Sequence, residues 1–142
     1  MPKYDKTLHQ ALSEVEKYKQ HKRKVTALKD AGKLFPVLTV LQGAYDKRIN
    51  FNMPKGLPPM PEREEAIERV EVMHDKHYKN FAYFVNKQIH QWEREKAFTT
   101  LLETIPEDDV DVIVAMKDKD LTTVFPSLTR EFVKEALPQL NL

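Results

Sequence analysis

Apolar side chains recur at helical spacing through most of this chain, and one proline-rich segment interrupts them. Leu8, Leu12 and Val15 are three or four positions apart, so they would share one face of a helix. Further stripes with this spacing follow, and the clearest covers residues 97–105. In contrast, four of the eight residues at positions 54–61 are proline, which breaks a helix when it lies in the interior. The sequence therefore predicts an all-α fold with one extended connector.

The length and the residue content indicate one domain. The chain has 142 residues, of which 41% are hydrophobic and 32% are charged, enough for one core and a well-solvated exterior. We expect residues 1–142 to form a single compact multi-helix domain, with the proline-rich connector at about residues 43–61. A connector of this length inside a compact domain is usually packed or functional.

Two helix boundaries can be predicted in the first third of the chain. The apolar stripe thins at residues 17–24 and then resumes, and Gly32 is expected to end that helix in the left-handed conformation. Residues 34–42 are strongly apolar and could form a buried helix or a strand. Pro36 suits a first helical turn, and the helical context favours a helix.

The C-terminal third predicts two further helices. Pro106 is expected in the first turn of one of them, with the acidic residues 107–109 placed favourably for its dipole. Ser127 or Thr129 is expected to cap the last helix. The charged residues 117–120 between the two helices are interpreted as a simple helix end.

Most catalytic chemistry is excluded by the residues that are missing. The chain has no cysteine, and none of its three glycines belongs to a nucleotide-binding loop or to the Lys-x-Asp-Gly motif of ATP-dependent ligases. Glu71, His74 and His77 would share a helical face, but a di-iron site needs a second Glu-x-x-His, so a polar surface is expected. We expect no enzyme activity, no cofactor, no metal and no small-molecule substrate. No apolar run reaches the length of a membrane span and the first residues do not form a signal peptide, so no membrane association is expected.

The net charge of +1 conceals a strong segregation of charge. Residues 17–55 contain ten Lys or Arg and two acidic residues, a balance of +8. Residues 62–75 and 97–120 have balances of −4 and −5. The basic block is consistent with a polyanionic partner, and equally with a solvated helix face.

Three segments resemble, in the same order, parts of a known DNA-binding domain. Residues 33–48 look like a helix that leads through an aromatic and a basic residue to the extended stretch 49–54, and residues 96–105 precede an acidic helix. Residues 106–142 read as two short helices joined by an Asp-Leu turn. This order is similar to the N-terminal DNA-binding domain of bacteriophage-type ATP-dependent DNA ligases. We expect such a domain without the ligase, since the adenylation motif is absent.

Two departures from the ligase pattern remove glycine. The ligases have Thr-Gly-Asn where this chain has Glu-Arg-Glu at residues 93–95, and Cys-Gly-x-Ser where it has Pro-Ser-Leu-Thr at residues 126–129. A second resemblance is closer, to a group of small uncharacterised proteins of tailed phages, including phages of cyanobacteria. It rests on residues 41–48, on the Tyr-Phe-Val sequence at 83–85, and on an ending that runs from Leu128 to Pro138.

The ligase resemblance implies an accessory protein that binds duplex DNA through its backbone, in the cytoplasm of the infected bacterial host. No base-reading motif is visible, so the binding is expected to be weakly sequence-specific. The expected contacts come from a long-range electrostatic group, from residues that flank the connector, and from the start of the last helix, which is a natural seat for phosphate. These residues are, in that order, Lys22, Arg23 and Lys24; Lys47, Arg48 and Lys55; and Ser127, Thr129 and Arg130.

The alternative is a protein-interaction protein, or a virion structural protein, that has the same helical fold and does not bind DNA. Tyr78, Tyr83, Trp92 and the connector would then form a contact surface for a phage or host protein. Aromatic residues at helical spacing can instead belong to a core.

Overall fold

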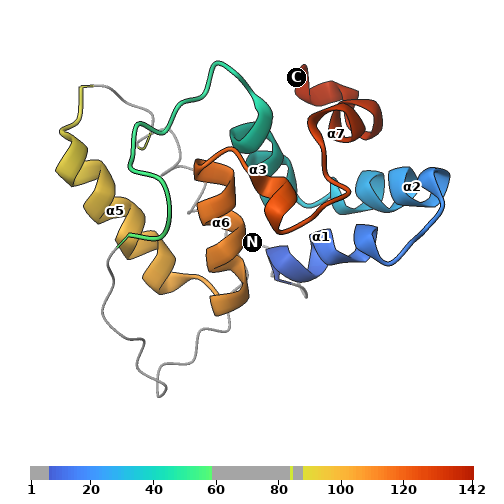
Figure 1. Ribbon diagram of the computed structural model, residues 1–142, viewed down its shortest axis with the longest axis horizontal. Coiled ribbons are helices and arrows are strands. Elements are labelled where there is room, and N and C mark those ends of the chain that lie inside the picture. The colour runs from blue at the N-terminus through green and yellow to red at the C-terminus, as the bar shows by residue number, and fades with distance from the viewer. Residues whose placement is uncertain (1–6, 59–83, 85–87) are drawn as a thin grey trace.

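The computed structural model describes residues 7–58, 84 and 88–142, and all regular secondary structure in this part of the chain is helical, without strands. The all-α prediction is therefore confirmed (Figure 1). The elements are α1 (Leu8–Glu16), α2 (His21–Ala31), α3 (Phe35–Tyr45), α5 (Gln91–Thr104), α6 (Glu107–Lys117), η1 (Leu121–Thr123), α7 (Arg130–Ala136) and η2 (Pro138–Leu140).

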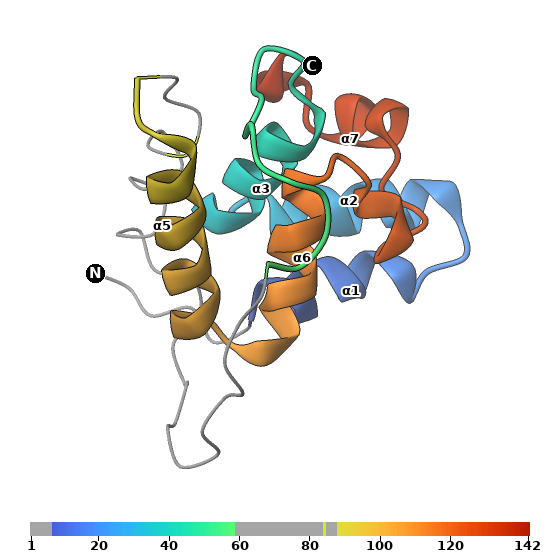
Figure 2. The same ribbon diagram turned by 60° about the vertical axis from the view of Figure 1, so that its left-hand side comes forward.

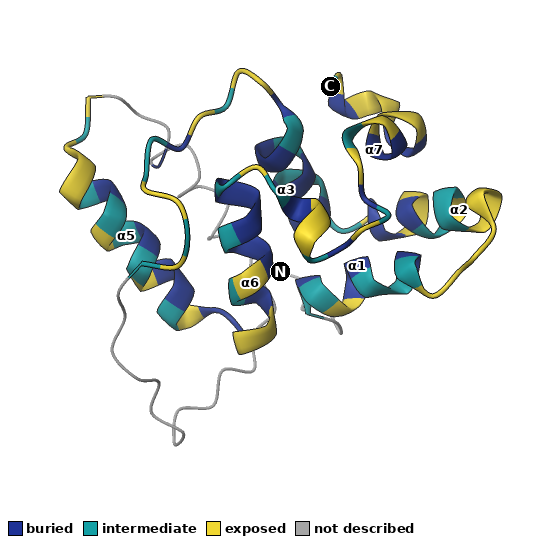
Figure 3. Cartoon of the chain, in the orientation of Figure 1, coloured by how far each residue is buried: buried dark blue, intermediate teal, exposed yellow. Residues whose placement is uncertain are grey.

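Helix α6 lies at the centre of the described structure. It packs against α1 and α3, while α2 packs against α1 and α7. Figure 1 shows α6 between α5 on one side and α1 and α3 on the other, and Figure 2 again shows α6 between α5 and α1. Val112, Ile113 and Met116 of α6 are completely buried, and full burial of each such side chain contributes about 1.5–3 kcal/mol. Figure 3 shows that the helix faces turned toward the neighbouring helices are buried, whereas the faces turned outward are exposed.

The predicted boundaries are largely confirmed at the start of the chain. Residues 17–20 separate α1 from α2, residues 34–42 are helical, and Pro36 lies in the first turn of α3. Helix α3 continues to Tyr45, so the connector begins later than predicted, and its described part is residues 46–58.

Gly32 does not have the left-handed conformation that the sequence suggested. Its φ is −66°, which any residue can adopt. The reason for glycine is close packing, because a Cβ atom at this position would lie 2.7 Å from Cδ2 of Leu137. Gly43 is similar, since a Cβ there would lie 2.8 Å from Sδ of Met116 and hold α3 away from α6.

The acidic start of α6 also anchors α1. The three acids do lie in the first turn, as predicted, but Pro106 precedes this turn as its N-cap. Asp109 is completely buried and accepts hydrogen bonds from the amides of Leu8 (3.2 Å) and His9 (2.8 Å). Burial raises the pKa of Asp109, and the two hydrogen bonds oppose this shift. Asp109 thus satisfies amides at the start of α1 that have no partner within the helix.

Residues 117–120 are more than the charged helix end that was predicted, because they fasten the connector. Lys117 Nζ donates to the Pro54 carbonyl and to Asp118 Oδ1, both at 2.6 Å, and the Gly56 amide donates to Asp118 Oδ2 at 2.9 Å. The side chains of Lys117 and Asp118 are only 2% and 7% exposed. A buried ion pair of this kind needs additional hydrogen bonds to offset its desolvation, and the connector backbone provides them.

The next lysine fastens the beginning of the connector. Lys119 Nζ donates to the carbonyls of Gly43 (2.5 Å) and Asp46 (3.2 Å) and lies over the ring of Phe51. Burial lowers the pKa of Lys119. The described part of the connector is therefore tightly packed, as a long connector in a small domain usually is.

Candidate nucleic-acid interface

The loop before α7 contacts both the basic start of α2 and the end of α3. Lys24 Nζ donates to Ser127 Oγ at 2.6 Å, and Arg130 Nε donates to the Tyr45 carbonyl at 3.3 Å. The Tyr45 hydroxyl donates to the Leu128 carbonyl. Burial, with a smaller contribution from Glu131, raises the pKa of Tyr45 to about 12, so this hydroxyl remains a donor at neutral pH.

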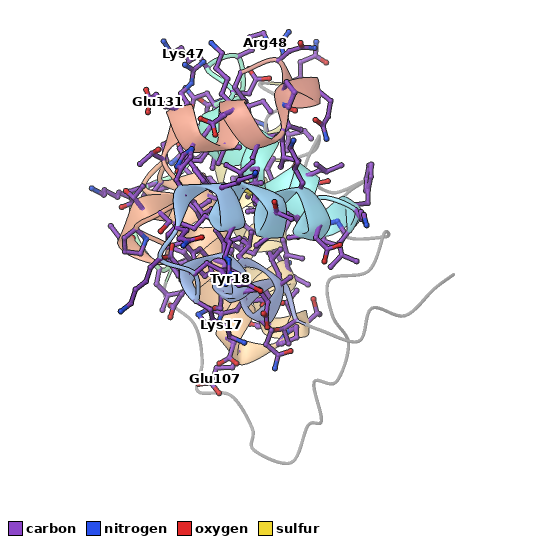
Figure 4. All side chains as sticks on the ribbon, turned by 90° about the vertical axis from the view of Figure 1, so that its right-hand side faces the viewer. Lys17, Tyr18, Lys47, Arg48, Glu107 and Glu131 are labelled. Carbon is purple, nitrogen blue, oxygen red and sulfur yellow. The ribbon has the colours of Figure 1, made fainter. Side chains whose placement is uncertain are left out.

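These contacts gather members of all three predicted groups on one side of the molecule. Figure 4 looks onto this side, where α7 lies above α2, and Lys47 and Arg48 project at the top. We call this region the basic surface. It consists of Lys22, Arg23, Lys24, Lys47, Arg48, Ser127, Thr129 and Arg130.

The first turn of α2 places cations where they do not stabilise their own helix. Lys22 and Arg23 are exposed, the turn contains no acidic residue, and Gln20 makes no side-chain capping bond. A helix N-terminus carries a partial positive charge, so each cation there is disfavoured by an interaction of about 0.3–1 kcal/mol. Helix stability therefore does not explain these side chains, whereas an anionic ligand would benefit from them.

The turn after α3 offers one paired and one unpaired cation. Arg48 Nε and Nη2 donate to the two carboxylate oxygens of Asp46, at 3.0 and 2.8 Å, and these bonds hold the pKa of Asp46 well below its usual range. The Arg48 side chain is nevertheless 78% exposed, so its remaining N–H groups face solvent. Lys47 is exposed and makes no ion pair within the described residues.

The hydroxyl groups of the loop already have partners in the protein. Thr129 Oγ1 caps α7 by accepting from the Phe132 amide at 3.2 Å, which confirms Thr129 as the predicted N-cap. Ser127 donates both its amide and its hydroxyl to the carboxylate of Glu16, each at 2.8 Å. The contact with Glu16 was not predicted, because 111 positions separate the two residues and no local pattern connects them.

Lys55 lies apart from the basic surface. It lines a cavity of about 390 Å³ between the connector and α5, together with Leu57, Lys96 and Phe98. In Figure 1 this part of the connector lies beside α5, well to the left of α2 and α7. The structure therefore does not bring Lys55 together with the other predicted contact residues.

The surface suggested for a protein partner is only partly described. Trp92, in the first turn of α5, is 62% exposed, and Leu57 of the connector is 60% exposed. Tyr78 and Tyr83 lie outside the described residues. Trp92 is consequently a surface residue and does not belong to the core.

The remaining predicted features give no further site. Glu71, His74 and His77 lie outside the described residues. Within residues 7–58, 84 and 88–142, no three histidine or acidic side chains are grouped so that they could hold a metal ion. None of the helices in these ranges combines the length and the apolar content needed to cross a membrane.

Comparison with known proteins gives one match. Residues 11–123, from α1 through η1, match the model of a family described as a family of unknown function, DUF6433. No curated protein matches the chain, and no solved structure does.

Proposed function

This chain belongs to the DUF6433 family, whose function is unknown, and we propose that it is a non-catalytic accessory protein that binds duplex DNA through the phosphate backbone. The observation that carries the proposal is the double contact of the loop before α7, in which Ser127 contacts Lys24 and Leu128 contacts Tyr45. This loop joins two segments, each with two exposed cations, into the basic surface.

The exposed side chains of the basic surface are suited to phosphate groups. Lys22, Arg23, Lys47 and Arg48 reach solvent from two different elements, so they could contact successive phosphates along one groove. Contacts of Lys and Arg with phosphates position a protein on DNA but do not read its sequence. Binding with little sequence preference follows from this.

The phage setting rests on the resemblances to phage-type ligases and to tailed-phage proteins. In that setting the protein would act in the cytoplasm of the infected bacterial host. The acidic balance of residues 97–120, which include α6, gives this segment a net charge that phosphate repels. Such an asymmetry would orient the protein on the duplex.

The test is fluorescence anisotropy of a labelled duplex of random sequence across a salt series. Four phosphate contacts would give a log–log slope of the association constant against salt of about −3.6, at about −0.9 per contact. A duplex of different sequence should bind with similar affinity. A flat salt response, or no binding at low salt, would contradict the proposal.

The second candidate is a protein-interaction or virion structural protein, and the exposure of Trp92 and Leu57 favours it. Leu57 lines the cavity beside α5, and exposed apolar patches are typical of contact surfaces. Affinity capture from infected cells, with and without nuclease, separates the two functions. Partners that persist after nuclease treatment and depend on Trp92 would support the second candidate.

A further inference from the structure

The carboxylate of Glu16 occupies a group of anion-binding donors on the basic surface. The Ser127 amide donates to Glu16 Oε1 and the Ser127 hydroxyl donates to Oε2, both at 2.8 Å. The Lys24 ammonium lies 3.9 Å from Oε2 and donates to the Ser127 hydroxyl at 2.6 Å. Two hydrogen-bond donors of Ser127 and the ammonium group of Lys24, from distant parts of the chain, thus face one internal anion.

We infer that Ser127 and Lys24 form a seat for a DNA phosphate, and that Glu16 blocks this seat in the wild-type protein unless its side chain rotates away. This inference rests on the proposed function. A phosphodiester presents two anionic oxygens, as a carboxylate does, and backbone amides, hydroxyls and ammonium groups bind both through charge-assisted hydrogen bonds. The donors that now hold Glu16 are therefore of the kind that a phosphate requires.

The seat can be reached from solvent. The side chains of Glu16 and Lys24 are 28% and 19% exposed, and Ser127 is partly exposed. The exposed Lys22 and Arg23 precede Lys24 on the same turn of α2 and would contact neighbouring phosphates. A phosphate in the seat would consequently lie beside the strongest concentration of cations in the predicted site.

Glu16 is also placed where it can leave. It is the last residue of α1, where the helix carries a partial negative charge, and no basic residue lies in that last turn. Its own helix therefore does not favour the carboxylate, and Ser127 and Lys24 hold it. Release into solvent would require only a rotation of the Glu16 side chain, so α1 and α2 could remain packed against each other.

The decisive comparison is between Glu16→Ala and Glu14→Ala in the full chain. Both remove one negative charge from the last turn of α1, but Glu14 pairs with Lys17 rather than with the seat. If Glu16 blocks one phosphate contact, E16A should strengthen duplex binding about eightfold at about 0.1 M salt and steepen the salt slope by about 0.9. E14A should change the affinity much less and leave the slope unchanged.

A second substitution tests whether the gain comes from the seat. Ser127→Ala should weaken DNA binding more in the E16A background, where Ser127 is free to hold a phosphate, than in the wild-type protein, where Glu16 holds Ser127, and it should remove a large part of the gain from E16A. Glu16→Gln with Glu14→Gln provides a second pair that retains an acceptor for the Ser127 amide. Circular dichroism verifies folding, and the Gln pair replaces the Ala pair if E16A is unfolded.

The outcomes separate this inference from the proposed function. Salt-dependent DNA binding by the wild type, with equal gains for the position-16 and position-14 variants, would overturn the phosphate seat and leave DNA binding intact. An equal loss from S127A in both backgrounds would overturn it too, because Ser127 would already contact DNA. Absence of binding by all variants at low salt would overturn the proposed function, and the seat with it.

Discussion

The hydroxyl of Tyr45 donates a hydrogen bond to the carbonyl of Leu128, and this bond connects the end of α3 to the loop before α7. The Arg130 guanidinium strengthens the connection by donating to the Tyr45 carbonyl. The position of the loop, and with it the basic surface, depends on Tyr45.

Replacement of Tyr45 by Phe should lower the free energy of unfolding by about 1–2 kcal/mol, because it leaves a partly buried carbonyl without its donor. Urea denaturation measures this loss. Duplex binding should weaken as well, since the loop would no longer be held against α3. Replacement of the exposed Tyr18, which is 38% exposed, by Phe is the matched control and should change neither quantity noticeably.

The stability of the fold should also depend on Tyr45 at alkaline pH. Its pKa in the folded protein is about 12, above the usual value of 10, so the folded state retains the proton longer than the unfolded state does. The contribution of the neutral hydroxyl is fully present below pH 10 and is lost as the pH rises from 10 to 12. Urea midpoints should therefore fall more steeply over this interval in the wild type than in Tyr45→Phe. Parallel curves for the two proteins would contradict the prediction.

Asp109→Ala should destabilise the junction of α6 with α1. The Leu8 and His9 amides would lose their acceptor, and removal of a helix cap together with a charge-assisted hydrogen bond costs about 2–3 kcal/mol. Hydrogen exchange should show lower protection in the first turn of α1. Asp108→Ala, at the exposed neighbouring position, is the control, and a comparable loss there would contradict the role of Asp109.

Lys117→Met should release the connector. The substitution leaves the buried Asp118 carboxylate without its cation and the Pro54 carbonyl without a donor, and breaking a buried pair in this way costs about 3 kcal/mol or more. The Gly56 amide, which donates to Asp118, should exchange faster with solvent. Lys96→Met removes an exposed lysine that, like Lys117, lines the cavity between the connector and α5. It should have little effect on the free energy of unfolding or on the exchange of the Gly56 amide.

Reversal of single charges on the basic surface should weaken DNA binding. Lys22→Glu and Lys47→Glu each remove one phosphate contact. The affinity for the duplex should therefore fall about tenfold at about 0.1 M salt, and the slope of the log association constant against log salt should become shallower by about 0.9. Arg48 is not a suitable position, because its loss would leave the buried Asp46 unpaired. Lys55→Glu makes the same charge change beside α5 and should bind almost as the wild type does. A loss from Lys55→Glu as large as from the other two would place the interface elsewhere.

The helices could be predicted from the sequence because the spacing of apolar residues is a local property. The buried positions Leu101, Leu102 and Ile105 follow their stripe, and Thr129 caps α7 through a bond to a residue three positions away. The contacts that hold Ser127 could not be predicted, since Lys24 and Glu16 are 103 and 111 positions distant.

One wrong and one incomplete prediction have the same physical origin. Gly32 and residues 117–120 were interpreted by local rules for helix ends, as a left-handed cap and as a charged terminus. In the structure, packing of Leu137 accounts for the glycine, and bonds to the connector account for the lysines. Tertiary contacts decide the role of such residues, and a local pattern contains no information about them.

The bonds of Lys117, Asp118 and Lys119 to the connector imply an order of assembly. They join residues that are 62 to 76 positions apart, whereas α6 and the turn that ends it form from neighbours in sequence. Closing a loop of this length is slow relative to helix formation, so local structure should come first. We therefore expect the end of α6 to be formed before the connector docks. A substitution that disturbs this turn would then slow folding as well as lower stability.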